Sequence, residues 1–127
     1  MDLLSALRSL WHENLGDDPE WHLSEVIRTG QIHVFYDREG IAGWVDWWWL
    51  TEDAIRPFFS GGKRSLDPTV GLHLCGNTGR FVRPVSPKAL RRVCWRVIRS
   101  RPTRTVCWQT VHKQDRAILH WRVINHG

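Results

Sequence analysis

The C-terminal stretch of the chain, residues 105–127, reads TVCWQTVHKQDRAILHWRVINHG and decides between fold classes. Its first seven residues alternate at period two and are good strand formers, which is typical of a β-strand. Further on, Ala117, Trp121 and Ile124 recur at helical spacing, and Gly127 stands where a left-handed helix C-cap is wanted. The stretch therefore predicts a strand followed by a helix.

Length and charge limit the number of domains and the kind of partner that we expect. The chain has 127 residues, 42% of them hydrophobic, which is enough for one domain with one core over residues 1–127. We expect helices in residues 1–30 and a sheet with further helices in residues 31–127. The net charge of +5 favours an anionic partner, such as nucleic acid, a phosphate-bearing cofactor, an acidic protein or a membrane surface.

The sequence also indicates the expected compartment and the expected state of the cysteines. It contains no 18-residue apolar run, and its N-terminus lacks the basic flank of a signal peptide, so we expect a cytoplasmic protein without a transmembrane segment. Cys75, Cys94 and Cys107 are an odd number without a Cys-x-x-Cys pair. This pattern predicts buried free thiols rather than a disulfide framework or a metal site.

The first 59 residues carry the boundary signals of several elements. Asp2 is a helix N-cap ahead of an apolar stripe, and Asp18 and Pro19 open a second helix that Gly30 ends. Strand-forming residues on either side of Arg38-Glu39-Gly40 predict a hairpin. The expected elements are a helix over 2–13, a helix over 18–30, a hairpin over 31–50 and a short helix that starts at Thr51.

The second half predicts further strands around one well-marked helix. Val70–Cys75 and Arg80–Val85 are extended, either as two strands around a Gly-rich turn or as one long bent strand. Ser86 caps and Pro87 opens a helix that runs to residue 100. This order predicts an α/β (α+β) fold, in which an antiparallel sheet turns parallel through a right-handed crossover containing that helix.

Three short motifs resemble those of the GNAT superfamily of N-acetyltransferases, over residues 24–127. The hairpin with Gly40 and Gly43 is similar to its second and third strands, and Val82-Arg83-Pro84 is similar to the Val-x-Pro that closes its fourth. Gln114-x-x-Ala117-Ile118 resembles its Asn-x-x-Ala-Ile motif, with Gln in place of Asn. The resemblance implies a mixed, mostly antiparallel sheet flanked by helices. The family's last two strands would be missing, because the chain stops at the motif's Gly.

Two groups within that superfamily look similar. Toxin-activating lysine acyltransferases also open with helices and carry a Trp-containing strand followed by a helix start like Leu50-Thr51-Glu52. Short GNAT-like proteins of tailed bacteriophages share the compact length, and this resemblance implies a role in the virion or in the host cytoplasm. The sequence does not separate the two groups.

The expected cofactor loop departs from the family. Active members present glycine N–H groups to the pyrophosphate of coenzyme A, whereas residues 85–91 contain no glycine and include a proline. This departure argues against ordinary acetyl-CoA binding. If an acyl-CoA or an acyl carrier protein does bind, the resemblance places it at Val82, Arg83, Ser86, Lys88, Arg91 and Gln114. The alternative is a capped helix with solvated cations.

The catalytic groups of the family are hard to match. The usual tyrosine acid falls near Val123, and the only tyrosine is Tyr36. The resemblance to lysine acyltransferases makes His12 a candidate base, and its strand position for an acid is closest to His73, a second candidate base. Asp46 is a candidate to orient a histidine. For His73 and Asp46 the alternative is an ordinary surface position.

Tryptophan and arginine supply the candidate binding residues. Trp47, Trp48 and Trp49 are consecutive, so they cannot all face one core. Either they grip a partner, or helices cover both faces of the sheet. The helix after Pro87 presents Arg92, Arg96 and Arg99, which suit phosphates, an acidic protein or simply solvent.

These observations lead to a ranked set of hypotheses. We expect a GNAT-like protein without ordinary acetyl-CoA catalysis, acting as a binding, virion-associated or host-interaction module for an acidic protein or for a second copy of itself. One alternative is an acyltransferase that moves an acyl group from a CoA or acyl carrier protein thioester to a protein amine. The other is a nucleic-acid-binding module.

Overall fold

The computed structural model describes residues 2–15, 20–59, 71–76, 80–111 and 117–124. Most of the expected elements are confirmed, with ends within a few residues of those predicted. In chain order the elements are α1 (Leu3–Leu15), α2 (Glu20–Arg28), β1 (Ile32–Asp37), β2 (Gly40–Leu50), η1 (Glu52–Ala54), α3 (Ile55–Phe59), β3 (His73–Gly76), β4 (Arg80–Phe81), α4 (Pro87–Arg99), β5 (Thr105–Val111) and β6 (Ala117–Val123).

Local signals account for several of these ends. The backbone N–H of Ser5 donates to Asp2 Oδ1 at 2.7 Å, which confirms the predicted cap of α1. Gly30 ends α2 with φ of +70°, and Gly40 turns the hairpin with φ of +113°, a region that favours glycine. The predicted start of α2 at Asp18 and Pro19 lies outside the described residues. No helix in the described parts of the chain is long and apolar enough to span a membrane.

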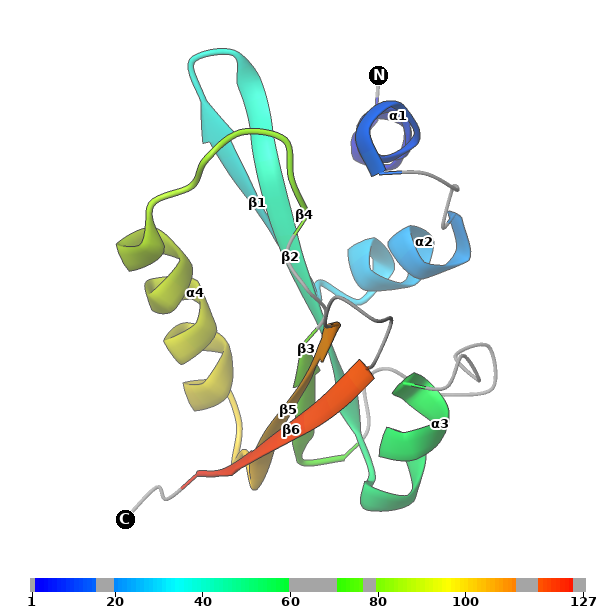
Figure 1. Cartoon of the computed structure of the whole chain (residues 1–127), viewed down its shortest axis with the longest axis vertical. Helices are drawn as coiled ribbons and strands as arrows, with labels where there is room; N and C mark the ends of the chain where they lie inside the picture. The colour runs from blue at the N-terminus through cyan, green and yellow to red at the C-terminus, as the bar shows by residue number, and fades with distance from the viewer. Residues whose placement is uncertain (1, 16–19, 60–70, 77–79, 112–116, 125–127) are drawn as a thin grey trace.

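The strands form one mixed, mostly antiparallel sheet, as predicted (Figure 1). Its order is β1-β2-β3-β5-β6, with β4 also on β2. The only parallel pair among the described strands is β3 with β5, on either side of α4 in the sequence. The chain is therefore an α+β fold whose sheet contains one parallel pair, β3 with β5, and becomes antiparallel again at β6.

The strand β2 organises this sheet. Its first half pairs with β1, and its other edge pairs with β3 near Leu50 and with β4 near Gly43. Trp47 lies opposite Gly76 and Trp44 opposite Arg80, so three steps along β2 match four along its neighbour. Because β3 and β4 both pair with β2 along one edge, they do not pair with each other as the two strands of a hairpin would.

Helices cover both faces of the sheet, so the second reading of the tryptophan run is the one that the structure realises. On one face, Trp44 and Trp48 are fully buried beneath α1 and α2. On the other face, Trp49 packs beneath α4 and is 3% exposed. Figure 1 shows α4 on one side of the sheet and α1, α2 and α3 on the other. Alternating side chains of one strand thus supply two cores.

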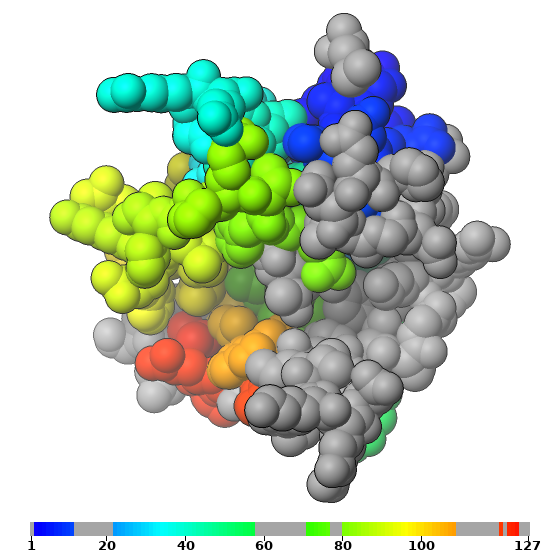
Figure 2. All heavy atoms as spheres, turned by 45° about the horizontal axis from the view of Figure 1, so that its top comes forward, coloured from blue at the N-terminus to red at the C-terminus, as the bar shows by residue number. Residues whose placement is uncertain are grey.

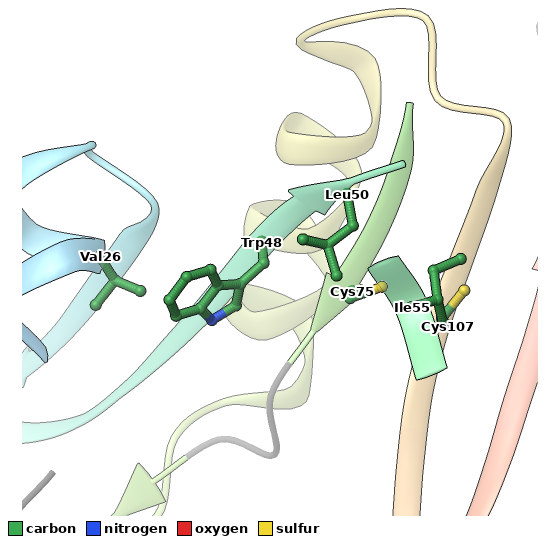
Figure 3. Packing of buried hydrophobic residues seen from close by; sticks show 6 residues of the cluster. All are labelled: Val26, Trp48, Leu50, Ile55, Cys75 and Cys107. Carbon is green, nitrogen blue, oxygen red and sulfur yellow. The ribbon is translucent and has the colours of Figure 1, made fainter. Parts of the chain in front are cut away.

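The core beneath α2 and α3 joins distant parts of the chain. Figure 3 shows its members, which come from α2, β2, α3, β3 and β5 and are all fully buried. Cys75 and Cys107 lie directly opposite each other on β3 and β5 and face this core. All three cysteines are free, but the expectation that all are buried is wrong for Cys94, which is exposed on α4.

The predicted C-terminal helix is wrong. Residues 117–123 form β6, which pairs antiparallel with the whole of β5, from Val111 opposite Ala117 to Thr105 opposite Val123. The segment also alternates at period two, and a short apolar run does not distinguish helix from strand by itself. Pairing with β6 gives hydrogen-bond partners to the backbone groups along one edge of β5. A helix over residues 117–123 would have left that edge open. The expectation that the sheet ends with β5 is corrected at the same time.

Candidate functional site

The outer face of α4 is strongly basic. Ser86 caps this helix by accepting from the backbone N–H of Ala89, and Val93, Val97 and Ile98 turn inward against the sheet. The opposite face is therefore left to long cationic side chains, which project from the edge of the molecule in Figure 2 (yellow). An open hollow of about 610 Å³ is lined by Lys88, Arg91, Arg92, Trp95, Arg96 and Arg99. We call these six residues the basic face.

The electrostatics of the basic face are one-sided. The sequence of α4 contains no Asp or Glu, and no described carboxylate pairs with any cation of the basic face. Trp95 stands among these cations and is 41% exposed. The Arg99 guanidinium lies over its ring, 5.4 Å from the centroid. The surface thus combines concentrated positive charge with an accessible aromatic ring.

A second hollow adjoins the first. It has a volume of about 400 Å³ and lies between the C-terminal end of α4, the start of β1 and the middle of β2. We call it the β1 groove; its lining includes Gln31, Trp47, Trp49, Arg96 and Arg101. Arg101 lies over the Trp49 ring at 4.4 Å. Arg96 lines both hollows, so they adjoin at its side chain.

Arg96 is held in place by a histidine of the first strand. Its Nη2 donates to His33 Nδ1 at 3.0 Å. Burial and the Arg96 cation both lower the pKa of His33 below its ordinary value. The ring is therefore neutral at physiological pH and can accept this hydrogen bond.

Of the predicted catalytic residues, the two whose side chains the structure describes, Asp46 and His73, do not come together in one cleft. Asp46 does hold a histidine, but this is His22 of α2, whose Nε2 lies 2.8 Å from Asp46 Oδ1. His73 is half-buried on β3, with its Nδ1 2.6 Å from Thr105 Oγ1. His73 lies opposite Leu50 of β2. Leu50 is four residues from Asp46 along this strand, which corresponds to about 13 Å. His12 belongs to α1, and its side chain lies outside the described part of the structure.

The His22–Asp46 pair lies in the core rather than on a surface. The side chains are 7% and 3% exposed, and the His22 ring packs against Trp48, with 5.3 Å between ring centroids. A macromolecular substrate does not reach groups that are covered to this extent. As placed, the pair fixes α2 on β2 and is a structural contact.

The residues expected to bind an acyl donor serve several roles. Arg83 donates to both carboxylate oxygens of Asp37, from Nε at 2.5 Å and from Nη2 at 2.9 Å, and also to the Ile41 carbonyl at 2.8 Å. It therefore ties the segment after β4 to the hairpin tip. Ser86 is occupied as a cap, Lys88 and Arg91 belong to the basic face, and Val82 follows β4. Gln114 lies outside the described residues.

The residues expected to bind a partner fall into a buried group and an accessible group. Trp48 and Trp49 have almost no exposed surface, whereas Trp47 is half-buried and lines the β1 groove. Arg92, Arg96 and Arg99 do meet on the basic face. Sequence reasoning missed Trp95, although helical spacing after Lys88, Arg91 and Arg92 places it on their face. It also missed Arg101 and His22, which only distant contacts reveal.

The arrangement is better suited to binding than to proton transfer, because its exposed groups are cations and aromatic rings. Among the described residues no three His, Cys, Asp or Glu side chains are grouped to hold a metal ion. No protein-family model and no curated protein matches this chain.

Proposed function

We propose that this protein is a binding module without ordinary acetyl-CoA catalysis, and that it docks the basic face of α4 on an anionic partner. The observation that carries the proposal is the one-sided charge of this helix. Five cations surround an exposed tryptophan, and no described carboxylate pairs with them. A virion-associated or host-interaction role in the host cytoplasm fits a module of this kind.

Physical arguments support this assignment. Clustered cations on a rigid helix raise the local concentration of an anionic partner and speed its encounter. They act together because α4 is fixed by its cap and by its buried residues Val93, Val97 and Ile98. Arg and Trp are also the side chains that dominate binding interfaces. Binding through such a face weakens as salt rises.

A charge-matched pair of variants tests the proposal. R91E/R92E reverses two charges on the basic face, and R38E/R104E makes the same change in net charge at two exposed arginines elsewhere. Binding of poly-L-glutamate, a polysulfated polysaccharide and an oligonucleotide is measured by fluorescence anisotropy at low and moderate salt. We expect R91E/R92E to lose at least about tenfold in affinity for whichever polyanion binds, and R38E/R104E to lose far less. Equal losses in both variants, or no binding to any polyanion, would overturn the proposal.

A second candidate, acyl transfer from a thioester, is favoured by one observation. An apolar cavity of about 110 Å³ lies between α4 and the sheet, lined by residues that include Val45, Leu74, Val93, Val97 and Val106. A short acyl chain has a size and polarity that match such a cavity.

Thermal unfolding with acyl donors tests this second candidate. Acetyl-CoA, a long-chain acyl-CoA and a charged acyl carrier protein are compared, and a donor at a hundred times its dissociation constant adds about 2.7 kcal/mol to stability. V93W, which fills the cavity, should remove that shift. Turnover that survives in both H12A and H73A would contradict the proposed bases, and no shift with any donor would remove this candidate.

A further inference from the structure

We propose that the anionic partner is single-stranded nucleic acid, bound along a track that runs from the basic face over Arg96 into the β1 groove. This inference rests on the proposed function and names the partner of the same surface. It is carried by three observations: the adjacency of the two hollows at Arg96, the placement of tryptophan in both, and the internal bonding of the groove's uncharged polar side chains.

The two hollows adjoin at one cation. Arg96 lines both, and Arg101 adds a second cation to the lining of the β1 groove. The basic face follows α4, whose 13 residues span about 20 Å. A positively charged path that can follow a sugar–phosphate backbone is one of the two features shared by proteins that bind single strands.

The second such feature is a set of aromatic platforms for bases. Trp95 is exposed among the cations of the basic face, and half-buried Trp47 lines the β1 groove. Flat rings beside guanidinium groups suit nucleobases, which stack on them, better than the side chains of an acidic peptide, which are not planar rings. Stacking requires unpaired bases, because a duplex covers the faces of its bases. The placement of Trp47 in a groove therefore favours a single strand.

The uncharged polar side chains of the groove are already engaged. Gln31 donates to Thr29 Oγ1 at 2.7 Å and accepts from the backbone N–H of Trp49 at 3.2 Å. The hydroxyl of Thr29 donates to the Glu25 carbonyl, and that of Ser100 to the Val97 carbonyl. These groups are directed into the protein rather than toward a base edge. We therefore expect binding that tolerates different base sequences.

The experiment uses matched exposed tryptophans. Trp95 is 41% exposed on the track, whereas Trp108 is 38% exposed on β5 and lines neither hollow. Affinity of the full chain for a labelled oligothymidylate of about 12 nucleotides is measured by anisotropy. We expect W95A to weaken binding about tenfold, the equivalent of about 1.4 kcal/mol, while W95F keeps most of the affinity and W108A stays within about twofold. A comparison of circular dichroism spectra shows that each variant is folded.

Salt and competitor polymers separate this inference from the proposed function. R96A should lower the slope of log affinity against log salt by about 0.7, the value for one phosphate contact on a single strand. Equal affinity for mixed-sequence strands and weaker binding of the matched duplex are expected. Binding of poly-L-glutamate but not of the oligonucleotide would overturn this inference and leave the proposed function standing. A duplex bound as tightly as the single strand, or W95A unchanged, would also overturn it, and binding of no polyanion would overturn both.

Discussion

At the residue scale, the buried pair His22–Asp46 shows how one polar contact fixes a helix on the sheet. Both side chains lie in the core, with 2.8 Å between His22 Nε2 and Asp46 Oδ1, and the His22 ring packs against the indole of Trp48. Burying polar groups is costly unless they bond to each other, so the pair stabilises the fold only while both partners remain. The same placement separates Asp46 from His73, one of the two histidines that the sequence made catalytic candidates.

The first prediction concerns this pair. D46A removes the acceptor of His22 Nε2 and should cost about 1–3 kcal/mol of unfolding free energy. D46N keeps an acceptor oxygen of similar size and should cost less. Urea unfolding followed by tryptophan fluorescence measures both variants. If D46A proves as stable as D46N, the pair does not hold α2 on the sheet.

The second prediction concerns the thiols. Cys75 and Cys107 are fully buried, and the hydrogen bond that the Cys75 thiol donates to Cys107 together with burial raises the pKa of Cys75. Cys94 is exposed on α4, although partial burial raises the pKa of its thiol too. A disulfide reagent should therefore modify one thiol rapidly in the native protein, at a rate that keeps rising above pH 8.5. C94S should abolish this fast phase, and a fast phase that survives in C94S would contradict the burial of the other two.

At the scale of elements, short local contacts hold the strands and helices in register. Arg83 joins the segment after β4 to the hairpin tip through Asp37 and Ile41. Close packing adds to this junction, because a side chain at Gly43 would lie 2.6 Å from the Arg80 carbonyl oxygen. Glycine at this position lets β4 approach β2.

The third prediction follows from the ion pair at this junction. The hydrogen bond from Arg83 lowers the pKa of Asp37 below its ordinary value. The native protein has the lowered pKa at Asp37, and the unfolded chain has the ordinary one. At a pH between these two values the unfolded chain binds the proton more readily than the native protein does. The pair's contribution is therefore fully present above about pH 4 and is lost as the pH falls through the native pKa. Wild type should exceed D37N in thermal stability at neutral pH, and the difference should shrink as the pH falls below 4. A difference that is independent of pH would contradict this account.

At the scale of the whole molecule, one sheet joins two cores. The core beneath α1, α2 and α3 and the core beneath α4 share β2, whose side chains point to both in alternation. Both cores therefore depend on the position of the β2 backbone. This arrangement also leaves the outer face of α4 open for a partner, because its inner face alone supplies the packing.

The fourth prediction tests whether these cores form a single unit. L50A empties space in the core beneath α2 and α3, and L74A does so beneath α4. Each should cost about 2–5 kcal/mol, and each should shift one common unfolding transition. Fluorescence and circular dichroism curves that coincide in both variants are the expected result. Two separate transitions in either variant would mean that the cores unfold independently.

Elements whose signals are local could be predicted from the sequence. Ser86 and Pro87 mark the start of α4, Gly30 and Gly40 mark chain reversals, and the apolar spacing of α4 places its arginines outward. These features depend on neighbours within one or two turns, so a linear pattern contains them. The mixed sheet followed from their order.

Features that depend on distant contacts could not be predicted from any local stretch. Residues 117–123 fit helix and strand periods alike, and pairing with β5 selects the strand. His22 meets Asp46 across 24 residues, and Arg96 meets His33 across 63. The joining of the basic face to the β1 groove likewise depends on how α4 lies on β1 and β2. The physical reason is that such contacts depend on which surfaces the whole chain buries together, and no local stretch of sequence contains that choice.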